Sequence, residues 1–183
     1  MSAALPRVFT IGHSTHPLAE FIALLRGAGV EMVVDVRRLP HSRRNPQFGS
    51  EALQQSLPAA GIGYRHMPAL GGRRHRPKGA PPSPNGLWQN QSFRNFADYA
   101  LGEAFQAELE ELVRLAAERP LALMCAEALW WQCHRRIIAD HLLARSNPVA
   151  HILPDGKIAP ARITPGARQD GDGRFIYPPP DSP

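Results

Sequence analysis

The chain has few cysteines and no long apolar run. Two cysteines in 183 residues exclude the disulfide-rich framework of a small secreted protein. No run approaches the roughly 18 apolar residues that a membrane-spanning helix requires. The first residues, MSAALPRVFTIGHS, lack the basic and long apolar segments of a secretory signal. We therefore expect a cytoplasmic protein that has no membrane partner.

Lysine is nearly absent, whereas arginine is abundant. Of the 21 basic residues only Lys78 and Lys157 are lysines, and the formal net charge is +5. The planar guanidinium of arginine binds phosphate and carboxylate groups through paired hydrogen bonds. This composition predicts an anionic small molecule or a nucleic acid as the partner.

Short apolar runs alternate with helical patterns along the chain. We expect strands at residues 7–11, 32–36, 63–67, 121–125 and 149–153, and helices at residues 17–27, 50–60, 93–117 and 133–144. This alternation predicts an α/β fold with three layers, in which a largely parallel sheet is flanked by helices. Residues 157–164 are expected to return as a last strand, which gives a short C-terminal hairpin. The expected organisation is one α/β domain at residues 1–164 and a Pro/Gly-rich C-terminal tail at residues 165–183.

The candidate catalytic residues lie near the end of the fourth expected strand. Cys125 ends this strand and Glu127 follows it, while Cys133, His134 and Arg135 open the next expected helix. Ligands of open parallel sheets bind outside the carboxyl ends of the strands. A thiol there is stabilised as a thiolate by unpaired amides and nearby cations. Either cysteine is thus a candidate nucleophile, Glu127 a candidate general acid or base, and His134 and Arg135 candidate substrate ligands. The alternative is that both thiols are ordinary buried residues.

The same side chains are also potential metal ligands. Cys125, Glu127, Cys133 and His134 supply donor types that zinc or iron accepts. No CxxC or HxxxH spacing supports a metal site, so we assign no metal ligand and the cofactor stays unknown. A disulfide requires the two thiols to approach each other, and a reducing compartment disfavours a permanent one.

A second group of candidates follows the second expected strand. Asp35 lies within an apolar run, where a carboxylate is costly unless it is paired, and an arginine is the expected partner. Arg37, Ser42 and Arg43, with two further arginines among them, are typical of a phosphate-binding loop. The alternatives are a buried structural pair and solvated surface charges.

Two other segments are candidates for ligand contact. His13 and Ser14 follow Gly12 at the end of the first strand, where the next helix can hold an anion, so we expect them to contact substrate. The loop at residues 68–91 is rich in Gly, Pro and Arg, and we expect it to close over phosphates, to contact a nucleic-acid backbone, or to be solvated without a ligand.

Ordered together, these motifs resemble a known family. They are Thr10-Ile-Gly-His-Ser14, Val34-Asp-Val-Arg37, Pro40-x-Ser42-Arg43 with Phe48, Leu70-Gly-Gly72, Cys125-Ala-Glu127, Cys133-His-Arg135 and His151-Ile152. The chain is similar, from about Val8 to Gly156, to the family named domain of unknown function 488 (DUF488). The resemblance implies an α/β fold and a site near the cysteine motifs, but no particular reaction.

Three hypotheses follow from these observations. The leading one is an enzyme that acts on a phosphorylated or nucleotide-like anionic substrate through the Cys/Glu/Arg site at the carboxyl edge of the sheet. The second is a non-catalytic nucleic-acid-binding module, which the positive charge and the basic loop favour. The third is a metal or redox site formed by the two cysteines. The oligomeric state is left open.

Overall fold

A six-stranded sheet forms the centre of the molecule, with strand order β3-β2-β4-β1-β5-β6. The computed structural model describes residues 5–181. The strands are β1 (Val8–Gly12), β2 (Met32–Asp35), β3 (Gly63–His66), β4 (Leu121–Cys125), β5 (Val149–Ile152) and β6 (Ile158–Pro160). Strands β1 to β5 are parallel, and β6 pairs antiparallel with β5 at one edge. The predicted largely parallel sheet is therefore confirmed.

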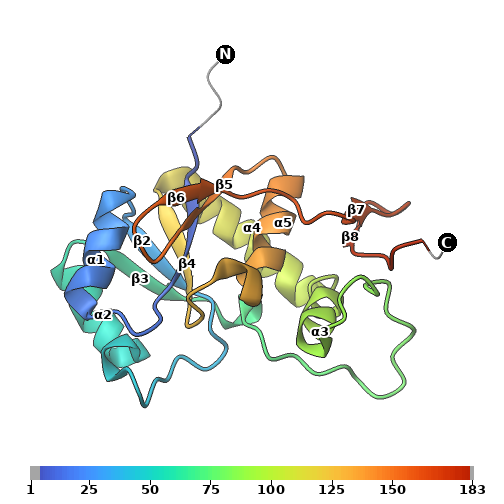
Figure 1. Cartoon of the computed structure of the whole chain (residues 1–183), viewed down its shortest axis with the longest axis horizontal. Coiled ribbons are helices and arrows are strands. Elements are labelled where there is room, and N and C mark those ends of the chain that lie inside the picture. The colour runs from blue at the N-terminus through green and yellow to red at the C-terminus, as the bar shows by residue number, and fades with distance from the viewer. Residues whose placement is uncertain (1–4, 182–183) are drawn as a thin grey trace.

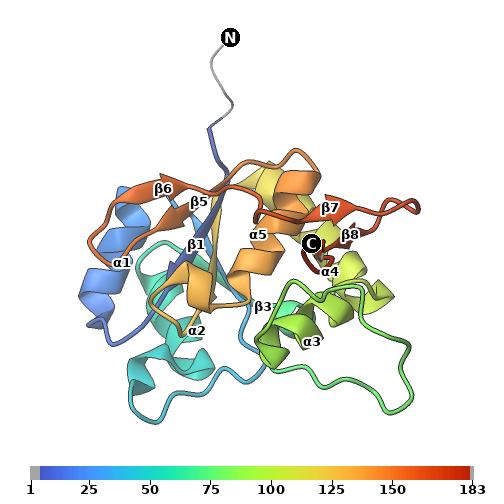
Figure 2. The ribbon, with the colours of Figure 1, turned by 45° about the vertical axis from the view of Figure 1, so that its right-hand side comes forward.

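Helices cover both faces of this sheet (Figures 1 and 2). They are α1 (Leu18–Gly27), α2 (Ser50–Ala59), α3 (Gln91–Tyr99), α4 (Glu103–Glu118) and α5 (Arg135–Ala144), with short 3-10 turns η1 (Pro46–Phe48), η2 (Pro68–Leu70) and η3 (Trp130–Gln132). The residues of α1 and α2 bury one face, and those of α3, α4 and α5 bury the other. The three predicted layers are confirmed. Within residues 5–181 no helix combines the length and apolar character that crossing a bilayer requires.

Strand β4 contributes to both layers of the core. All five of its residues are buried. Leu121, Leu123 and Cys125 join the cluster on the side of α4 and α5, whereas Ala122 and Met124 join the cluster on the other side. This alternation follows from the two-residue period of a strand. Strand β4 is therefore apolar at every position, which is typical of a central parallel strand that is buried on both faces.

Strand register brings the candidate strand ends together. Gly12 of β1 pairs with Cys125 of β4, and Asp35 of β2 pairs with Met124. The chain after β1 continues this pairing, because the His13 amide donates to the Cys125 carbonyl at 2.8 Å. A Cβ atom at Gly12 would lie 1.7 Å from the Glu127 carbonyl oxygen, so the close approach of these two segments requires glycine.

The single helix predicted over residues 93–117 is wrong. The structure has α3 and α4 there, separated at Ala100–Gly102. Gly102 has an extended conformation and precedes the first turn of α4. The apolar spacing misleads because Phe96, Ala100 and Phe105 pack into one core across the break. Gly102 favours a break in the helix, although the apolar spacing indicates a continuous one.

The helix predicted over residues 133–144 begins later. Helix α5 starts at Arg135, and Cys133 has an extended backbone with φ −132° and ψ 149°. Neighbouring side chains on a helix point apart. Because Cys133 lies outside the helix, its side chain can contact that of His134.

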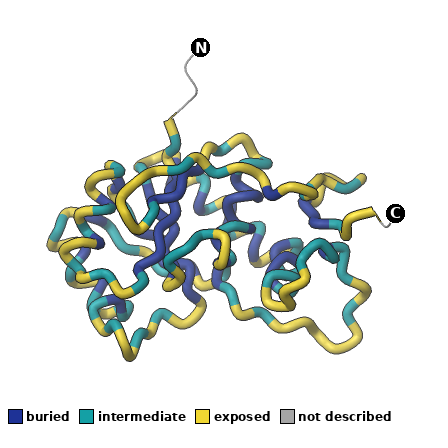
Figure 3. Tube along the Cα trace, viewed as in Figure 1, coloured by how far each residue is buried: buried dark blue, intermediate teal, exposed yellow. Residues whose placement is uncertain are grey.

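Part of the segment after residue 164 packs onto the domain. Strands β7 (Arg168–Gln169) and β8 (Phe175–Ile176) form an antiparallel pair. The return strand predicted at residues 157–164 is present as β6, which forms a hairpin with β5. Figure 3 shows a buried stretch within this segment. Phe175, Ile176 and Tyr177 are buried, and the Tyr177 hydroxyl donates to Asp140 of α5 at 2.8 Å. The domain boundary at residue 164 stays a prediction.

Candidate functional site

A cavity of about 700 Å³ opens at the carboxyl edge of the sheet. It lies between the ends of β2 and β4, the loop after η2, and the start of α3. Its basic residues are Arg37, Arg38, Arg43 and Arg73, with His41 and His134; its other chemically notable residues are Glu127, Cys125, Cys133, Asn90, Ser92, Phe93 and Phe96. Among the described lining residues, Glu127 is the one acid. The cavity is therefore strongly positive, with an aromatic wall on the α3 side.

The two cysteines contact each other beside this cavity. Both are free and buried, with 7 % of Cys125 and 3 % of Cys133 exposed. Their Sγ atoms lie 3.0 Å apart. Arg135 donates to the Cys133 sulfur from its backbone N at 3.5 Å and from Nε at 3.3 Å. Because these donors converge on Cys133, its sulfur is the acceptor of the pair and Cys125 is the thiol that donates to it.

The contacts separate the acidities of the two thiols. Burial alone would raise the pKa of Cys133, but the hydrogen bond from Cys125 and the Arg135 charge outweigh it and lower the pKa to about 6. The hydrogen bond to Cys133, together with burial, raises the pKa of Cys125 well above its ordinary value. These contacts therefore favour the negative charge on Cys133 over Cys125.

Arg135 is buried, and its described contacts lie within the protein. Only 1 % of the residue is exposed. Its Nη2 donates to the Glu127 carbonyl at 2.6 Å, while its Nε contacts the Cys133 sulfur. One guanidinium thus joins both ends of the loop between the cysteines. Within the protein it fixes this loop and neutralises the thiolate.

His134 is held in one orientation by the sheet. Its Nε2 donates to the Val36 carbonyl at 2.9 Å. Nδ1 lies 3.5 Å from the Cys133 sulfur. The donor atoms of Cys125, Cys133 and His134 all lie within 4.8 Å of one another, so these three residues could hold a metal ion. The Arg135 guanidinium also places a positive charge beside this sulfur.

Asp35 and Arg37 form a buried ion pair behind the cavity. The Arg37 Nε and Nη2 donate to the two carboxylate oxygens at 2.9 and 2.7 Å. The Tyr64 hydroxyl donates to the same carboxylate at 2.6 Å. Arg37 also donates to the Phe48 carbonyl and to Nε2 of His13. The expected arginine partner of Asp35 is present, and most of the guanidinium is used within the protein.

The remaining predicted residues divide between the cavity and the scaffold. Arg43 and Glu127 are exposed and line the cavity. His13 is buried, stacks on Phe48 at a centroid distance of 4.4 Å and donates to the Ser14 carbonyl. Ser42 accepts a hydrogen bond from the Asn45 amide within a turn. His13, Ser14, Asp35, Ser42 and Arg135 are not among the residues that line the cavity.

Sequence reasoning missed the part of the cavity that α3 supplies, and it named the loop at residues 68–91 only as a whole. Arg73 has a left-handed backbone with φ 57°, and its carbonyl accepts from Nη1 of Arg38 at 2.9 Å. Phe93 and Phe96 come from α3, where their spacing indicated only core packing. Gly71 was a usable signal, because a Cβ there would lie 2.7 Å from the Arg38 backbone.

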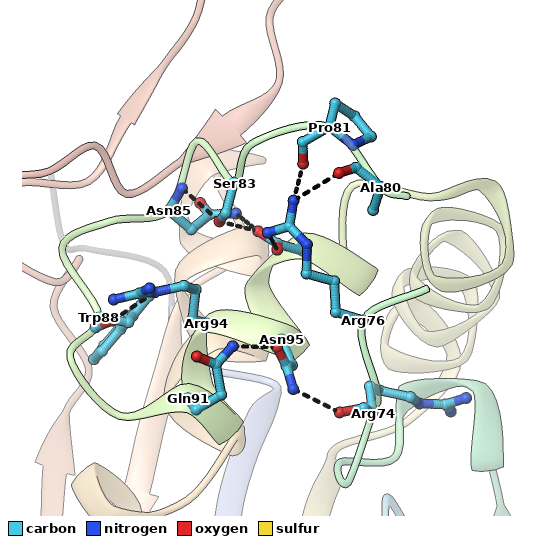
Figure 4. A network of polar contacts seen from close by, with 11 residues as sticks. Arg74, Arg76, Ala80, Pro81, Ser83, Asn85, Trp88, Gln91, Arg94 and Asn95 are labelled. Carbon is cyan, nitrogen blue, oxygen red and sulfur yellow. Dashed lines mark hydrogen bonds and ion pairs between the residues drawn. The ribbon is translucent and has the colours of Figure 1, made fainter. Parts of the chain in front are cut away.

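The basic loop (residues 71–81) is attached to the domain by its own arginines (Figure 4). Arg74 donates to the carbonyls of Gly71 and Pro68, and its guanidinium lies 3.9 Å from the Tyr99 ring centre. Arg76 donates to carbonyls at residues 80 and 81 and pairs with Asp98. These two cations are therefore engaged internally, and the loop offers fewer free charges than its sequence indicates.

The chain belongs to a known protein family. The model of the family described as "Domain of unknown function DUF488" matches residues 17–142, which is more than half of the chain. Cys125, Cys133 and the basic residues of the cavity lie inside the matched segment, whereas His13 and His151 lie outside it. Searches among curated proteins and among solved structures find no match.

Proposed function

We propose that the protein is an enzyme that acts on a phosphorylated or nucleotide-like anionic substrate, with the Cys133 thiolate as its nucleophile. The observation that carries the proposal is a buried, arginine-stabilised sulfur at the wall of a cavity lined by arginines. A thiolate is the reactive form of cysteine, and a pKa near 6 leaves most of it ionised at neutral pH. A positive cavity attracts the negative substrate toward it.

The cavity residues take different roles in this proposal. Arg38, Arg43 and Arg73 bind the phosphate, because they line the cavity and Arg37 is already engaged by Asp35. Phe93 supplies an apolar surface for a base or another flat group. The side chains come from segments far apart in the chain, so the site depends on the folded protein.

The thiolate attacks an electrophilic centre of the bound substrate, and a bond to sulfur forms as the leaving group departs. Glu127 is exposed on the cavity wall and can give the leaving group its proton. Cys125 donates its hydrogen bond to the thiolate before the attack. Arg135 acts as a positioning residue, because it touches the sulfur and the loop but does not line the cavity.

The test is a screen of phosphorylated compounds with four variants beside the wild type. Cys133→Ser is expected to abolish turnover, and Arg43→Gln is expected to raise KM. Arg44→Gln is the matched control, because Arg44 is an exposed neighbour outside the cavity lining. A substrate-derived adduct on Cys133, detected by mass spectrometry in the Glu127→Gln variant, would identify the nucleophile. Full activity of Cys133→Ser would refute the proposal.

A nucleic-acid-binding module is the second candidate, because Arg73, His75 and Lys78 of the basic loop are exposed. It predicts binding that weakens steeply with salt and is independent of both thiols. Titration of labelled single- and double-stranded nucleic acid at low and high salt measures this. We favour the enzyme, because Arg74 and Arg76 are turned toward the domain.

A further inference from the structure

The geometry points to a second chemistry for the two cysteines: we propose that they form a peroxide-sensitive dithiol that closes reversibly into a disulfide. The sulfurs lie 3.0 Å apart, and both residues line the same cavity. Cys133 carries the stabilising donors and is the sulfur that reacts first. Cys125 is the sulfur that resolves the oxidised product.

The two steps balance with hydrogen peroxide as the oxidant. The Cys133 thiolate attacks one peroxide oxygen, an S–O bond forms and the O–O bond breaks, and the leaving hydroxide takes a proton to become water. This gives a sulfenic acid on Cys133. The Cys125 sulfur then attacks the Cys133 sulfur, an S–S bond forms and the S–O bond breaks. The departing hydroxide takes the Cys125 proton, so the dithiol loses two electrons and peroxide gains them.

The surroundings of the sulfurs favour this sequence. Hydrogen peroxide is nearly as small as water, so it can reach these buried sulfurs through the cavity that both residues line. The Arg135 Nε and backbone N next to Cys133 stabilise the negative charge on the sulfur. Cys125 sits at the end of the central strand β4, between β1 and β2. Its partner lies in the loop that follows, so the bond can close within one short segment.

Closure has a consequence that rests on the proposed function. The disulfide consumes the nucleophile and removes the negative charge that Arg135 neutralises. Oxidation would therefore switch off substrate turnover, and a dithiol reductant would restore it. Disulfide formation itself requires no substrate and does not depend on the identity of the reaction.

The test treats the reduced full-length chain with a slight excess of hydrogen peroxide, in the presence of a chelator. The free thiols are then alkylated. The sequence between residues 120 and 134 has no Lys or Arg, so trypsin leaves both cysteines on one peptide that ends at Arg135. We expect this peptide to lose two hydrogens and to resist alkylation until dithiothreitol is added. Oxidation of Cys133 to higher oxyacids without a disulfide, or disulfides only between molecules, would overturn the proposal.

Variants assign the order of the steps. In Cys125→Ser, dimedone is expected to trap a sulfenic acid on Cys133, because the resolving thiol is gone. In Cys133→Ser, Cys125 is expected to stay reduced for at least ten times longer. If Cys125 in that variant is oxidised as fast as in the wild type, the proposed order of the steps is wrong. If either variant fails to fold, the disulfide in the wild-type peptide still tests the proposal.

The two proposals can fail separately. A reversible disulfide in a chain that turns over no phosphorylated compound would uphold the dithiol and refute the proposed substrate class. If peroxide leaves turnover unchanged and the cysteine peptide does not lose two hydrogens, the dithiol proposal is refuted and the proposed enzyme function is not. If both hold, oxidised protein is expected to have less than a tenth of the reduced activity.

Discussion

Replacing Arg135 tests the origin of the Cys133 reactivity. The lowering of the Cys133 pKa from 9.0 to about 6 corresponds to about 4 kcal/mol. The Arg135 Nε lies 3.3 Å from the sulfur. At an effective dielectric constant of about 20, one charge at this distance contributes roughly 5 kcal/mol. The guanidinium is thus a major cause of the lowering, together with the hydrogen bond from Cys125 and against the opposing effect of burial. Arg135→Gln should therefore raise the Cys133 pKa by about two units or more.

The assay is the pH dependence of Cys133 alkylation, followed by mass spectrometry. The wild-type midpoint is expected near pH 6, and that of Arg135→Gln above about pH 8. The midpoint is the quantity to compare, since a thiolate of higher pKa is also the better nucleophile, which partly offsets its lower population at pH 7. Arg135→Lys keeps the charge and should shift the midpoint less.

Arg136→Gln is the matched control. Arg136 is adjacent, but its Nε donates to the Thr164 hydroxyl at 3.1 Å instead of to a sulfur. Its replacement should leave the midpoint unchanged. If Arg135→Gln folds, by circular dichroism, and keeps the wild-type midpoint, the charge of Arg135 does not activate the thiol. Equal midpoints for the Gln and Lys variants would refute the electrostatic reasoning in the same way.

Three further predictions concern the scaffold. Asp35→Asn leaves the Arg37 guanidinium buried without its carboxylate, and it should lower the free energy of unfolding, measured in urea, by about 3–5 kcal/mol. Glu111→Gln is the control, because it breaks an exposed ion pair with Arg114 and should hardly change the urea concentration at the midpoint of unfolding. Gly12→Ala places a methyl group against the Glu127 carbonyl and should lower the free energy of unfolding by about 3 kcal/mol. Gly27→Ala is the control, because a Cβ there meets no atom within 4 Å, and it should leave the free energy of unfolding unchanged or raise it. Burial lowers the pKa of His13, His141 and His151 to about 4, so the unfolded chain binds protons that the folded chain does not. The contribution of these neutral histidines to the free energy of unfolding should therefore be fully present above about pH 6.5 and be lost toward pH 4, by up to about 3 kcal/mol for each histidine. A melting temperature that is constant between pH 7 and pH 4.5 would contradict this prediction.

The fold class was predictable because the strands carry local signals. The five apolar residues of β4 indicate a strand buried on both faces, and the structure has one. The break between α3 and α4 was not predictable from periodicity, since Phe96 and Phe105 face a common core across it. The buried residues Phe175–Tyr177 were missed because their short apolar run follows a Gly/Pro-rich stretch.

The position of the cavity was predictable, but the contacts of each candidate residue were not. The rule on strand ends selected Cys125, Glu127 and Arg37, which line the cavity. It could not distinguish Arg37 from Arg38, because the difference is tertiary. Arg37 is engaged by Asp35, and Arg38 is exposed at the cavity. A residue type indicates a chemistry, but only its other contacts show whether that chemistry is available to a ligand.

The contact between Cys133 and Arg135 illustrates why such roles need the structure. As members of one helix the two residues would have pointed in different directions, but Cys133 is extended and its sulfur turns back to the guanidinium. The same guanidinium holds the Glu127 carbonyl, so the loop conformation and the thiolate depend on one side chain. A change that loosens the loop should therefore raise the Cys133 pKa even without touching the sulfur. Gly12→Ala is such a change, and its alkylation midpoint should move upward together with its loss of stability.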